Sequence, residues 1–283
     1  MKIVLIALFT CSSYLACAQR FGIELFGGAS NYQGDLQQRV YTFNQSKFAF
    51  GLGASYALTD HFTVRAMANF GKIQADDKLN RDPLLQKRNL NFKSPITDLN
   101  LTLQYHILDV ETSRFSPYVF SGIALFRFKP YTFDTSGNQI FLQPIGTEGQ
   151  GLPEYPDRKG YQLTQISIPL GIGIKFAVNR SMSIGWEISM RKTFTDYLDD
   201  VSTTYVDENI LRTHRGQTAV DISYRGDEVK DGDLTYPAAG TQRGGSRFKD
   251  WYYFSGITAT IKFPSGENSG RKSSGIGCPK PVY

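Results

Sequence analysis

Long apolar runs are nearly missing from this chain of 283 residues. The run near the N-terminus, Ile3–Phe9, is far shorter than the roughly 20 residues that a membrane-spanning helix needs. Insertion into a membrane would therefore have to use strands, whose backbone groups pair with one another in a closed sheet. The scarcity argues against a helical membrane protein and leaves a β-barrel as the membrane fold.

Cysteine is also scarce, with three residues in the chain. Cys11 and Cys17 lie in an N-terminal stretch with a positive start, a short apolar run and a small-residue cleavage site, the pattern of a secretory signal peptide. We expect cleavage after residue 18, and a lipid anchor on Cys17 is disfavoured because an aromatic residue stands three positions before it. The exported chain would then keep Cys278 alone, which excludes an internal disulfide and leaves a free thiol or a bridge to another protein.

A strong charge bias and recognisable catalytic motifs are missing too. The net charge is +5 with the two signs interleaved, which does not fit nucleic-acid binding. Only one histidine, His214, lies in a long acid-rich segment, and the acids around it are Asp199, Asp200 and Asp207. No spacing motif joins them, nor is there a calcium-loop pattern, and Gly146–Gly151 lacks the lysine of a phosphate loop. We therefore predict no enzyme, no metal and no cofactor.

The chain is rich in segments in which apolar residues alternate with small or polar ones. From Ile166 to Phe176 every even position is apolar, and after a polar break the pattern resumes from Met182 to Met190. The residues between are glycine, serine and charged side chains. Each run has about ten residues, against about five or six in an ordinary strand. A strand with an apolar face and an opposite face of small or polar side chains is typical of a barrel wall between lipid and a narrow lumen.

Eight such runs occur, and their connections alternate between long and short. The predicted strands are 21–29, 47–58, 61–71, 94–108, 115–128, 166–176, 182–190 and 251–263. We predict an all-β protein, an eight-stranded antiparallel up-and-down transmembrane β-barrel over residues 19–263, with long extracellular loops and short periplasmic turns in the cell outer membrane. A soluble barrel such as a lipocalin is the alternative, but its outer face would carry more charge.

The inward face of this barrel carries charges of both signs. An eight-stranded lumen is just filled by side chains, so these charges need partners, and a plug is favoured over a proton or ion path. The predicted lumen network is Glu24, Arg65, Asp98, Asn100, Gln104, Glu187, Arg191 and Lys262.

The run Phe115–Phe128 is apolar on both faces, so its register is ambiguous. Here we expect the aromatic face to point outward, to lipid. Its members are Tyr118, Phe120, Phe126 and Phe128.

Basic residues on the loop side could meet the phosphates of lipopolysaccharide, or form an ordinary charged rim. They are Arg81, Lys87, Arg88, Lys93, Arg158 and Lys159. On the other side, residues 264–283 read as a flexible Gly/Ser-rich periplasmic tail ending in Cys-Pro-Lys-Pro-Val-Tyr. The last residues of this tail either contact a partner or form a frayed terminus. The contact candidates are Cys278, Pro279, Pro281 and Tyr283.

Six segments of the chain are distinctive beyond alternation: SNYQGDL (Ser30–Leu36), RFSPYVFSGIALFRFKP (Arg114–Pro130), LQPIGTEGQG (Leu142–Gly151), PDRKGYQLTQISIPLGIGIK (Pro156–Lys175), RKTFTDYLDDVSTTY (Arg191–Tyr205) and KDWYYFSGI (Lys249–Ile257). Together they resemble the PorG-like outer-membrane β-barrels of the type IX secretion machinery. The resemblance covers nearly the whole exported chain. It implies a non-enzymatic barrel, set in outer-membrane lipid and lipopolysaccharide, that associates with a periplasmic ring built from a lipoprotein and its partner. The alternative is an OmpA-like surface-binding barrel whose long loops recognise a ligand or lipopolysaccharide.

Overall fold

Eight strands close into an antiparallel barrel in the computed structural model, which describes residues 20–108, 113–179, 181–230 and 232–263. Each strand pairs with its neighbours in chain order, and β1 pairs with β10 to close the ring. The barrel strands are β1 (Phe21–Gln33), β2 (Lys47–Ala57), β3 (Phe62–Asp76), β4 (Asn91–His106), β5 (Phe115–Phe128), β8 (Thr164–Ala177), β9 (Met182–Thr193) and β10 (Trp251–Lys262). The predicted fold class is confirmed.

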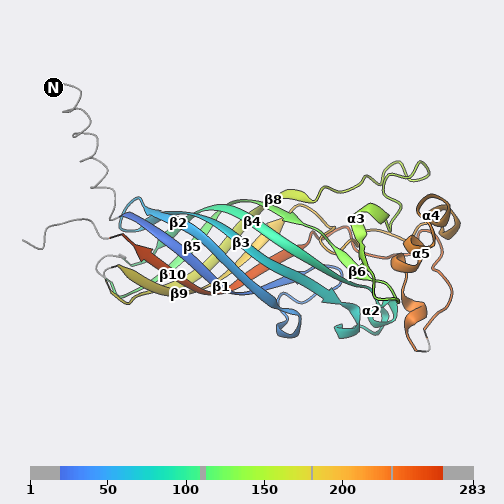
Figure 1. Cartoon of the computed structure of the whole chain (residues 1–283), viewed down its shortest axis with the longest axis horizontal. Helices are drawn as coiled ribbons and strands as arrows, with labels where there is room; N and C mark the ends of the chain where they lie inside the picture. The colour runs from blue at the N-terminus through green and yellow to red at the C-terminus, as the bar shows by residue number, and fades with distance from the viewer. Residues whose placement is uncertain (1–19, 109–112, 180, 231, 264–283) are drawn as a thin grey trace, which may run out of the picture.

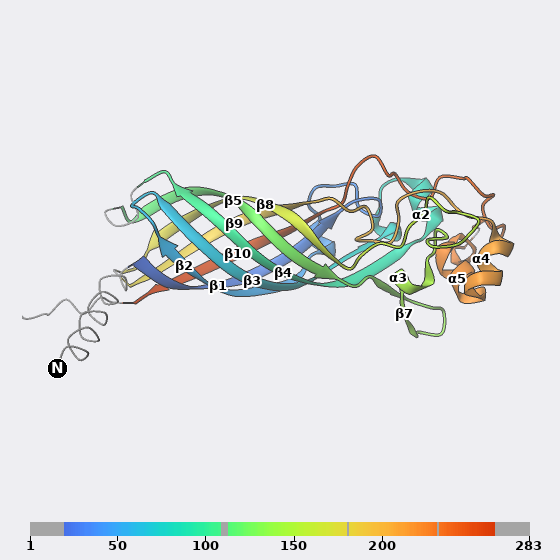
Figure 2. The ribbon, with the colours of Figure 1, turned by 90° about the horizontal axis from the view of Figure 1, so that it is seen from above.

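The long connections all lie at one end of the barrel, and the short turns lie at the other, where β1 begins and β10 ends (Figures 1 and 2). We call the four long connections, residues 34–46, 77–90, 129–163 and 194–250, the loop cap. Its small elements are β6 (Tyr131–Phe133), β7 (Gln139–Phe141), α2 (Pro83–Arg88), α3 (Leu142–Ile145), α4 (Glu208–Arg215), α5 (Gln217–Ser223) and the 3-10 turns η2 (Phe43–Gln45), η3 (Asp77–Leu79) and η4 (Gly226–Glu228). Among the described residues, no helix has the length and apolarity to cross a membrane.

The outer wall of the barrel is apolar and the inner wall is polar. Leu101 and Trp186 on the outer wall are 53% and 46% exposed, whereas Arg65 and Glu187 inside are 3% and 5% exposed. Aromatic side chains gather at the turn end, where Phe21 stacks on Phe263 with ring centroids 5.9 Å apart. Such aromatic belts mark the membrane interface in barrels of this kind. The chain is therefore an outer-membrane barrel, with its short turns in the periplasm.

The strands extend well beyond the bilayer on the loop side. β4 has 16 residues. At about 3.3 Å per residue and a tilt of about 40°, a strand of this length rises about 40 Å, against a lipid-facing band of about 25 Å. β3 and β4 consequently run past their predicted ends at Gly71 and Ser94, to Asp76 and Asn91.

Above the bilayer the two faces of the strands exchange character. Gln74 and Lys93 point outward there, and Ile73, Phe92 and Ile96 point inward and are buried. These inward side chains join Tyr32, Leu36, Phe126, Phe128, Leu142, Leu198, Val201, Ile222, Tyr252 and Phe254 in one hydrophobic core. The projecting end of the barrel and the loop cap thus share an ordinary water-soluble type of core.

The expected orientation of the ambiguous strand, β5, is wrong. Its aromatic residues Tyr118, Phe120, Phe126 and Phe128 point into the barrel and are buried, while Val119, Ile123 and Leu125 face lipid. The cause lies on the neighbouring strand. A Cβ atom on Gly171 would stand 2.3 Å from the Phe120 ring, and one on Gly173 would stand 2.4 Å from the Tyr118 ring. The two glycines leave the space that the aromatic rings fill.

The reversal of the faces predicts that the cost of a new charge depends on its height. Leu101→Arg places a cation at a lipid-facing position in the middle of the wall and should lower the free energy of unfolding by about 2–4 kcal/mol. Gln74→Arg, on the outward face above the bilayer, should change it by less than about 0.5 kcal/mol. Denaturant unfolding of both variants in lipid vesicles measures the difference, and equal costs would contradict the assigned membrane boundary.

Candidate functional site

Ion pairs cross the lumen from one wall to the opposite wall. The Arg65 guanidinium on β3 donates to both carboxylate oxygens of Glu187 on β9, with N–O distances of 2.7 and 3.3 Å. These strands lie on opposite sides of the eight-stranded ring. Tyr118 donates its hydroxyl to the same carboxylate at 2.9 Å, and the Phe120 ring lies 4.8 Å from the guanidinium carbon. The contacts fill and plug the middle of the barrel.

A second carboxylate, Asp98 on β4, gathers donors from three other strands. Arg191 on β9 donates through Nε at 3.1 Å, Tyr252 on β10 through its hydroxyl at 2.8 Å, and Asn69 on β3 through its amide at 3.1 Å. Asn100 adds a further hydrogen bond at 2.5 Å. Because the site is buried, each of these donors offsets part of the cost of removing the Asp98 charge from water.

A third pair lies nearer the periplasmic end. The Lys175 ammonium on β8 stands 3.6 Å from the Glu24 carboxylate on β1, and Thr260 donates to the same carboxylate at 3.0 Å. Lysine on the inward face of β8 was visible in the alternation, but its partner was not, because β1 and β8 meet only across the closed lumen.

The structure places most of the predicted lumen set in the interior. Lys262 is only half-buried, at the periplasmic end, whereas the others are buried: Glu24, Arg65, Asp98, Asn100, Gln104, Glu187 and Arg191. With its amide turned, Gln104 accepts from Arg65 at 3.0 and 3.2 Å. Sequence reasoning missed Tyr118 as a member because it assigned the wrong face of β5.

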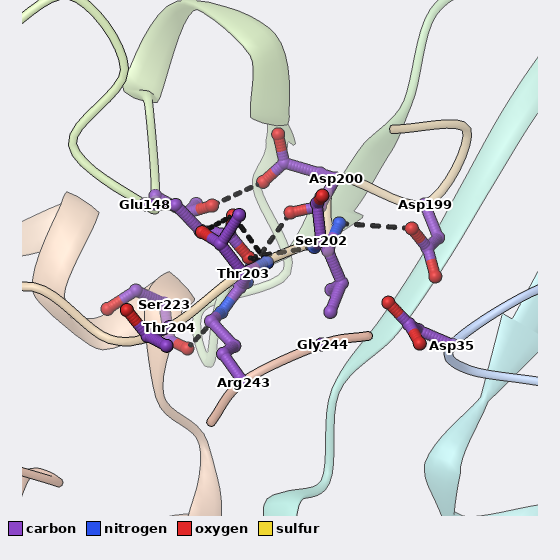
Figure 3. A network of polar contacts seen from close by, with 12 residues as sticks. Asp35, Glu148, Asp199, Asp200, Ser202, Thr203, Thr204, Ser223, Arg243 and Gly244 are labelled. Atoms are coloured by element: carbon purple, nitrogen blue, oxygen red, sulfur yellow. Dashed lines mark hydrogen bonds and ion pairs between the residues drawn. The ribbon is translucent and has the colours of Figure 1, made fainter. Parts of the chain in front are cut away.

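The loop cap is held by a buried carboxylate, Glu148. It accepts hydrogen bonds from the backbone N–H groups of Ser202 and Thr203 at 2.9 and 3.0 Å, and from the Thr203 hydroxyl at 2.6 Å (Figure 3). The Arg243 guanidinium completes the site at 3.0 Å and also donates to the Asp200 carbonyl at 2.7 Å. Three separate loop segments are thereby joined at one point.

Asp200 forms the next junction of the loop cap. Its carboxylate accepts from the Thr147 hydroxyl at 2.5 Å and from the Tyr161 hydroxyl at 2.6 Å. The residue has a left-handed backbone, with φ of 67°, which aspartate and asparagine tolerate better than most residues. Burial raises the pKa of the carboxyl to about 6, although Arg243 acts in the opposite direction.

Three further carboxyls lie beneath this junction, around Tyr32. The Tyr32 hydroxyl donates to Asp199 at 2.5 Å and lies 3.2 Å from an oxygen of Asp250, while Asp35 accepts from the Gly245 N–H at 2.9 Å. Burial raises the pKa of all three carboxyls. Nearby negative charges add to the effect, from Glu148 at Asp35, from Asp35 at Asp199 and from Asp199 at Asp250. In the described part of the chain, no group of three or more His, Cys, Asp and Glu is arranged to hold a metal.

The structure does not bring the candidate catalytic residues together. His214 lies at the surface, with Nε2 3.0 Å from Glu154. Asp199 and Asp200 bond elsewhere as described, and Asp207 caps α4 by accepting from the N–H groups of Asn209 and Ile210.

Two of the basic residues considered for lipopolysaccharide are used inside the loop cap. Arg88 pairs with buried Asp77 at 2.7 Å, and Arg158 donates to the Glu148 and Thr204 carbonyls, each at 2.8 Å. Both guanidiniums are therefore held by loop backbone and carboxylate, and contact of the set with lipopolysaccharide stays a prediction. The exposed members of the set are Arg81, Lys87, Lys93 and Lys159.

The candidate partner contacts Cys278, Pro279, Pro281 and Tyr283 lie outside the described residues, as does the expected signal peptide, residues 1–18.

A family model described as "Domain of unknown function (DUF6089)" matches residues 1–140. A search of the curated protein sequences found no match. Among solved structures, Neisserial surface protein A is 10% identical, with 86% of this chain and 97% of that chain covered and a TM-score of 0.41. OprG from Pseudomonas aeruginosa is 14% identical, with 86% and 97% covered and a TM-score of 0.41. Ail of Yersinia pestis is 11% identical, with 86% and 98% covered and a TM-score of 0.39. The membrane assignment therefore rests on the barrel's own closure, surface and connections.

The buried pair of the loop cap should matter far more than an exposed one. Arg243→Met leaves the Glu148 charge buried without its counter-charge and should lower the free energy of unfolding of the loop cap by about 3–5 kcal/mol. The matched control is Arg212→Met, which removes the half-exposed pair with Glu208 on α4 and should cost less than about 1 kcal/mol. Hydrogen exchange of residues 195–223 in the folded barrel measures both, and similar protection in the two variants would refute the role of the buried pair.

The raised pKa of Asp200 predicts that the loop cap loses stability as the pH rises. Its carboxyl titrates at about 6 in the folded chain, against an ordinary value of 3.8. Between those values the folded state holds one more proton than the unfolded state. The free energy of unfolding therefore falls with increasing pH, by at most about 1.4 kcal/mol per pH unit for one group.

Asp200→Asn keeps the left-handed backbone and removes the titration, so it should flatten this slope between about pH 4 and 6. Urea titrations of a Trp186→Phe background, in which Trp251 remains as the reporter at the base of the loop cap, give the slope directly. An unchanged slope in the Asn variant would show that Asp200 is not the titrating group.

Proposed function

We propose that this chain is a non-enzymatic outer-membrane component of the type IX protein secretion machinery. In this role it contacts the periplasmic ring, a lipoprotein and its partner, through its short turns and C-terminal tail. The observation that carries the proposal is the part played by the six distinctive segments. Several of their polar side chains form hydrogen bonds between one segment and another inside the loop cap.

Three of the distinctive segments supply residues that hold the loop cap together. SNYQGDL supplies Tyr32 and Asp35, LQPIGTEGQG supplies Thr147 and Glu148, and RKTFTDYLDDVSTTY supplies Asp199, Asp200 and the Thr203 and Thr204 contacts. A resemblance that extended only to the strands would reflect any barrel. One that includes this set of loop contacts supports a shared architecture of the loop cap as well.

The plugged lumen supports a role through contact rather than conduction. The pair Arg65–Glu187 joins opposite walls at the middle of the barrel, and the Asp98 and Glu24 sites fill other levels. An eight-stranded barrel with such a filled interior has no room for an unfolded polypeptide. A secretion component of this build acts by anchoring or positioning other proteins at the membrane.

The alternative, a surface-binding barrel, is favoured by a separate feature of the loop cap. Several large apolar side chains are exposed on it, namely Val40, Phe43, Leu84, Leu234 and Phe248. Exposed apolar groups on an ordered scaffold are common at protein-binding surfaces. This candidate places the partner outside the cell, whereas the leading one places it in the periplasm.

Removing the tail should separate the two candidates. We expect deletion of residues 265–283 to lower recovery of the ring lipoprotein with the barrel, from detergent-solubilised outer membranes, by at least about tenfold, since a lost anchor of about 1.4 kcal/mol or more has this effect. A double variant of the loop cap, Phe43→Ser with Phe248→Ser, serves as the matched control and should leave recovery unchanged. The secretion proposal would be refuted if the ring lipoprotein were recovered normally after both the tail deletion and replacement of the turn 58–61 by Gly-Asn-Gly-Ser.

A further inference from the structure

A shallow apolar groove runs along the lipid-facing wall over β3, β4, β5 and β8. Its volume is about 570 Å³, and its lining includes Ala66, Ala68, Leu99, Leu101, Leu125 and Ile166. The groove exists because β3 presents two alanines, whereas the strands beside it present leucine and isoleucine. Ala68 pairs with Leu99, and Leu99 pairs with Leu125, so the small side chains lie at the edge of a row of large ones.

A polar pocket lies next to the groove, at the loop-side ends of β5 and β8. Its volume is about 470 Å³, and it is lined by Arg127, Gln143, Tyr161, Gln162, Leu163 and Thr164. Arg127 is the next outward residue after Leu125 on β5, and it pairs with Thr164, the next outward residue before Ile166 on β8. Successive outward positions on a strand are about 7 Å apart. The apolar groove therefore opens directly into the polar pocket.

Cations gather around this track of groove and pocket. Arg127 lines the pocket, and three exposed lysines stand near it outside the lining. Lys72 on β3 pairs with Pro95, two residues from the Thr97 that pairs with Arg127, while Lys93 lies two residues further along β4 and Lys129 two residues after Arg127. Within the described residues none of these four side chains forms an ion pair with an acid. The Lys93 and Lys129 ammoniums lie instead over the rings of Phe133 and Phe141, at 5.1 and 3.6 Å from the ring centroids. A group of cations without counter-charges on the protein leaves its charge for an anion from outside.

The height of these residues identifies the source of that anion. Arg127 and Lys72 stand where the outward face changes from apolar to polar, which is the level of the lipid headgroups. Below them the groove faces acyl chains. An arginine fork fits the oxygens of a phosphate in two hydrogen bonds, and lysines contribute charge beside it.

We propose that this face binds one phosphorylated, multiply acylated lipid of the outer leaflet. Its acyl chains lie in the groove beside Ala66 and Ala68, and its phosphate is held by Arg127 and Lys72, with Lys93 and Lys129 completing the positive field. Lys192 on β9, which borders β8, also points outward, but it pairs with Ile168, four residues along β8 from Thr164, and lines neither the groove nor the pocket. The site is independent of any periplasmic partner.

Titration of the purified full-length chain in detergent with diphosphoryl lipid A, read by native mass spectrometry, tests the site. Arg127→Glu should weaken binding by at least about tenfold, because it replaces the phosphate ligand with a repelling charge. Ala68→Trp should weaken it by about fivefold or more while leaving every charge in place, because it fills the groove. The matched control Lys192→Glu should bind within about twofold of the unaltered chain, since its charge change lies away from the track.

Three results would overturn the proposal. One is binding of both site variants at the original affinity, and another is an equal loss in the Lys192→Glu control, which would indicate general charge attraction. The third is competition by inorganic phosphate at the same concentration as the lipid, which would show that the acyl chains contribute nothing. Heat-dependent gel migration verifies that each variant is a folded barrel, and Arg127→Lys, which restores the positive charge, should recover part of the binding lost in Arg127→Glu.

Discussion

An eight-stranded barrel leaves an interior so narrow that a charge inside it must find its counter-charge on another wall. The bidentate contact between Arg65 and Glu187 meets this constraint at mid-lumen, where opposite strands meet. The other lumen contacts repeat the arrangement at other levels, so that carboxylates from β1, β4 and β9 each receive donors from several strands. Removing one member of such a network leaves a buried charge unpaired, and this couples the strands that contribute to it.

The same strands cross two environments, the lipid bilayer and the water beyond it. Inside the bilayer they turn apolar side chains outward to lipid and polar ones inward. Beyond it they do the reverse, with Ile73 and Phe92 in a buried core and Gln74 and Lys93 on the outward face. The reversal occurs without a break in the strands, because only the side chains change. The inward apolar side chains beyond the bilayer form a hydrophobic core against which the loop segments pack. Long loops on a barrel that ended at the membrane surface would have no such core.

The loop cap is organised by buried acids rather than by an extended sheet. Glu148 and Asp200 accept hydrogen bonds from residues far away in the sequence, and each satisfies backbone or hydroxyl groups that would otherwise be buried without partners. These are the positions at which the distinctive loop segments meet. Their acidic and glycine-rich character is therefore explained by the hydrogen bonds that a buried, irregular backbone requires.

The sequence by itself determined the closed barrel, its eight strands, the side of the long loops and most of the inward charges. A period of two assigns each residue to one face whenever the two faces differ in polarity. It could not orient β5, because both faces of that strand are apolar and the deciding glycines stand on β8. Nor could it pair Glu24 with Lys175, or Glu148 with Arg243, because those contacts exist only once the sheet has closed and the loops have folded over its end. Local pattern records which solvent a side chain prefers, and only the tertiary structure decides which distant group it meets.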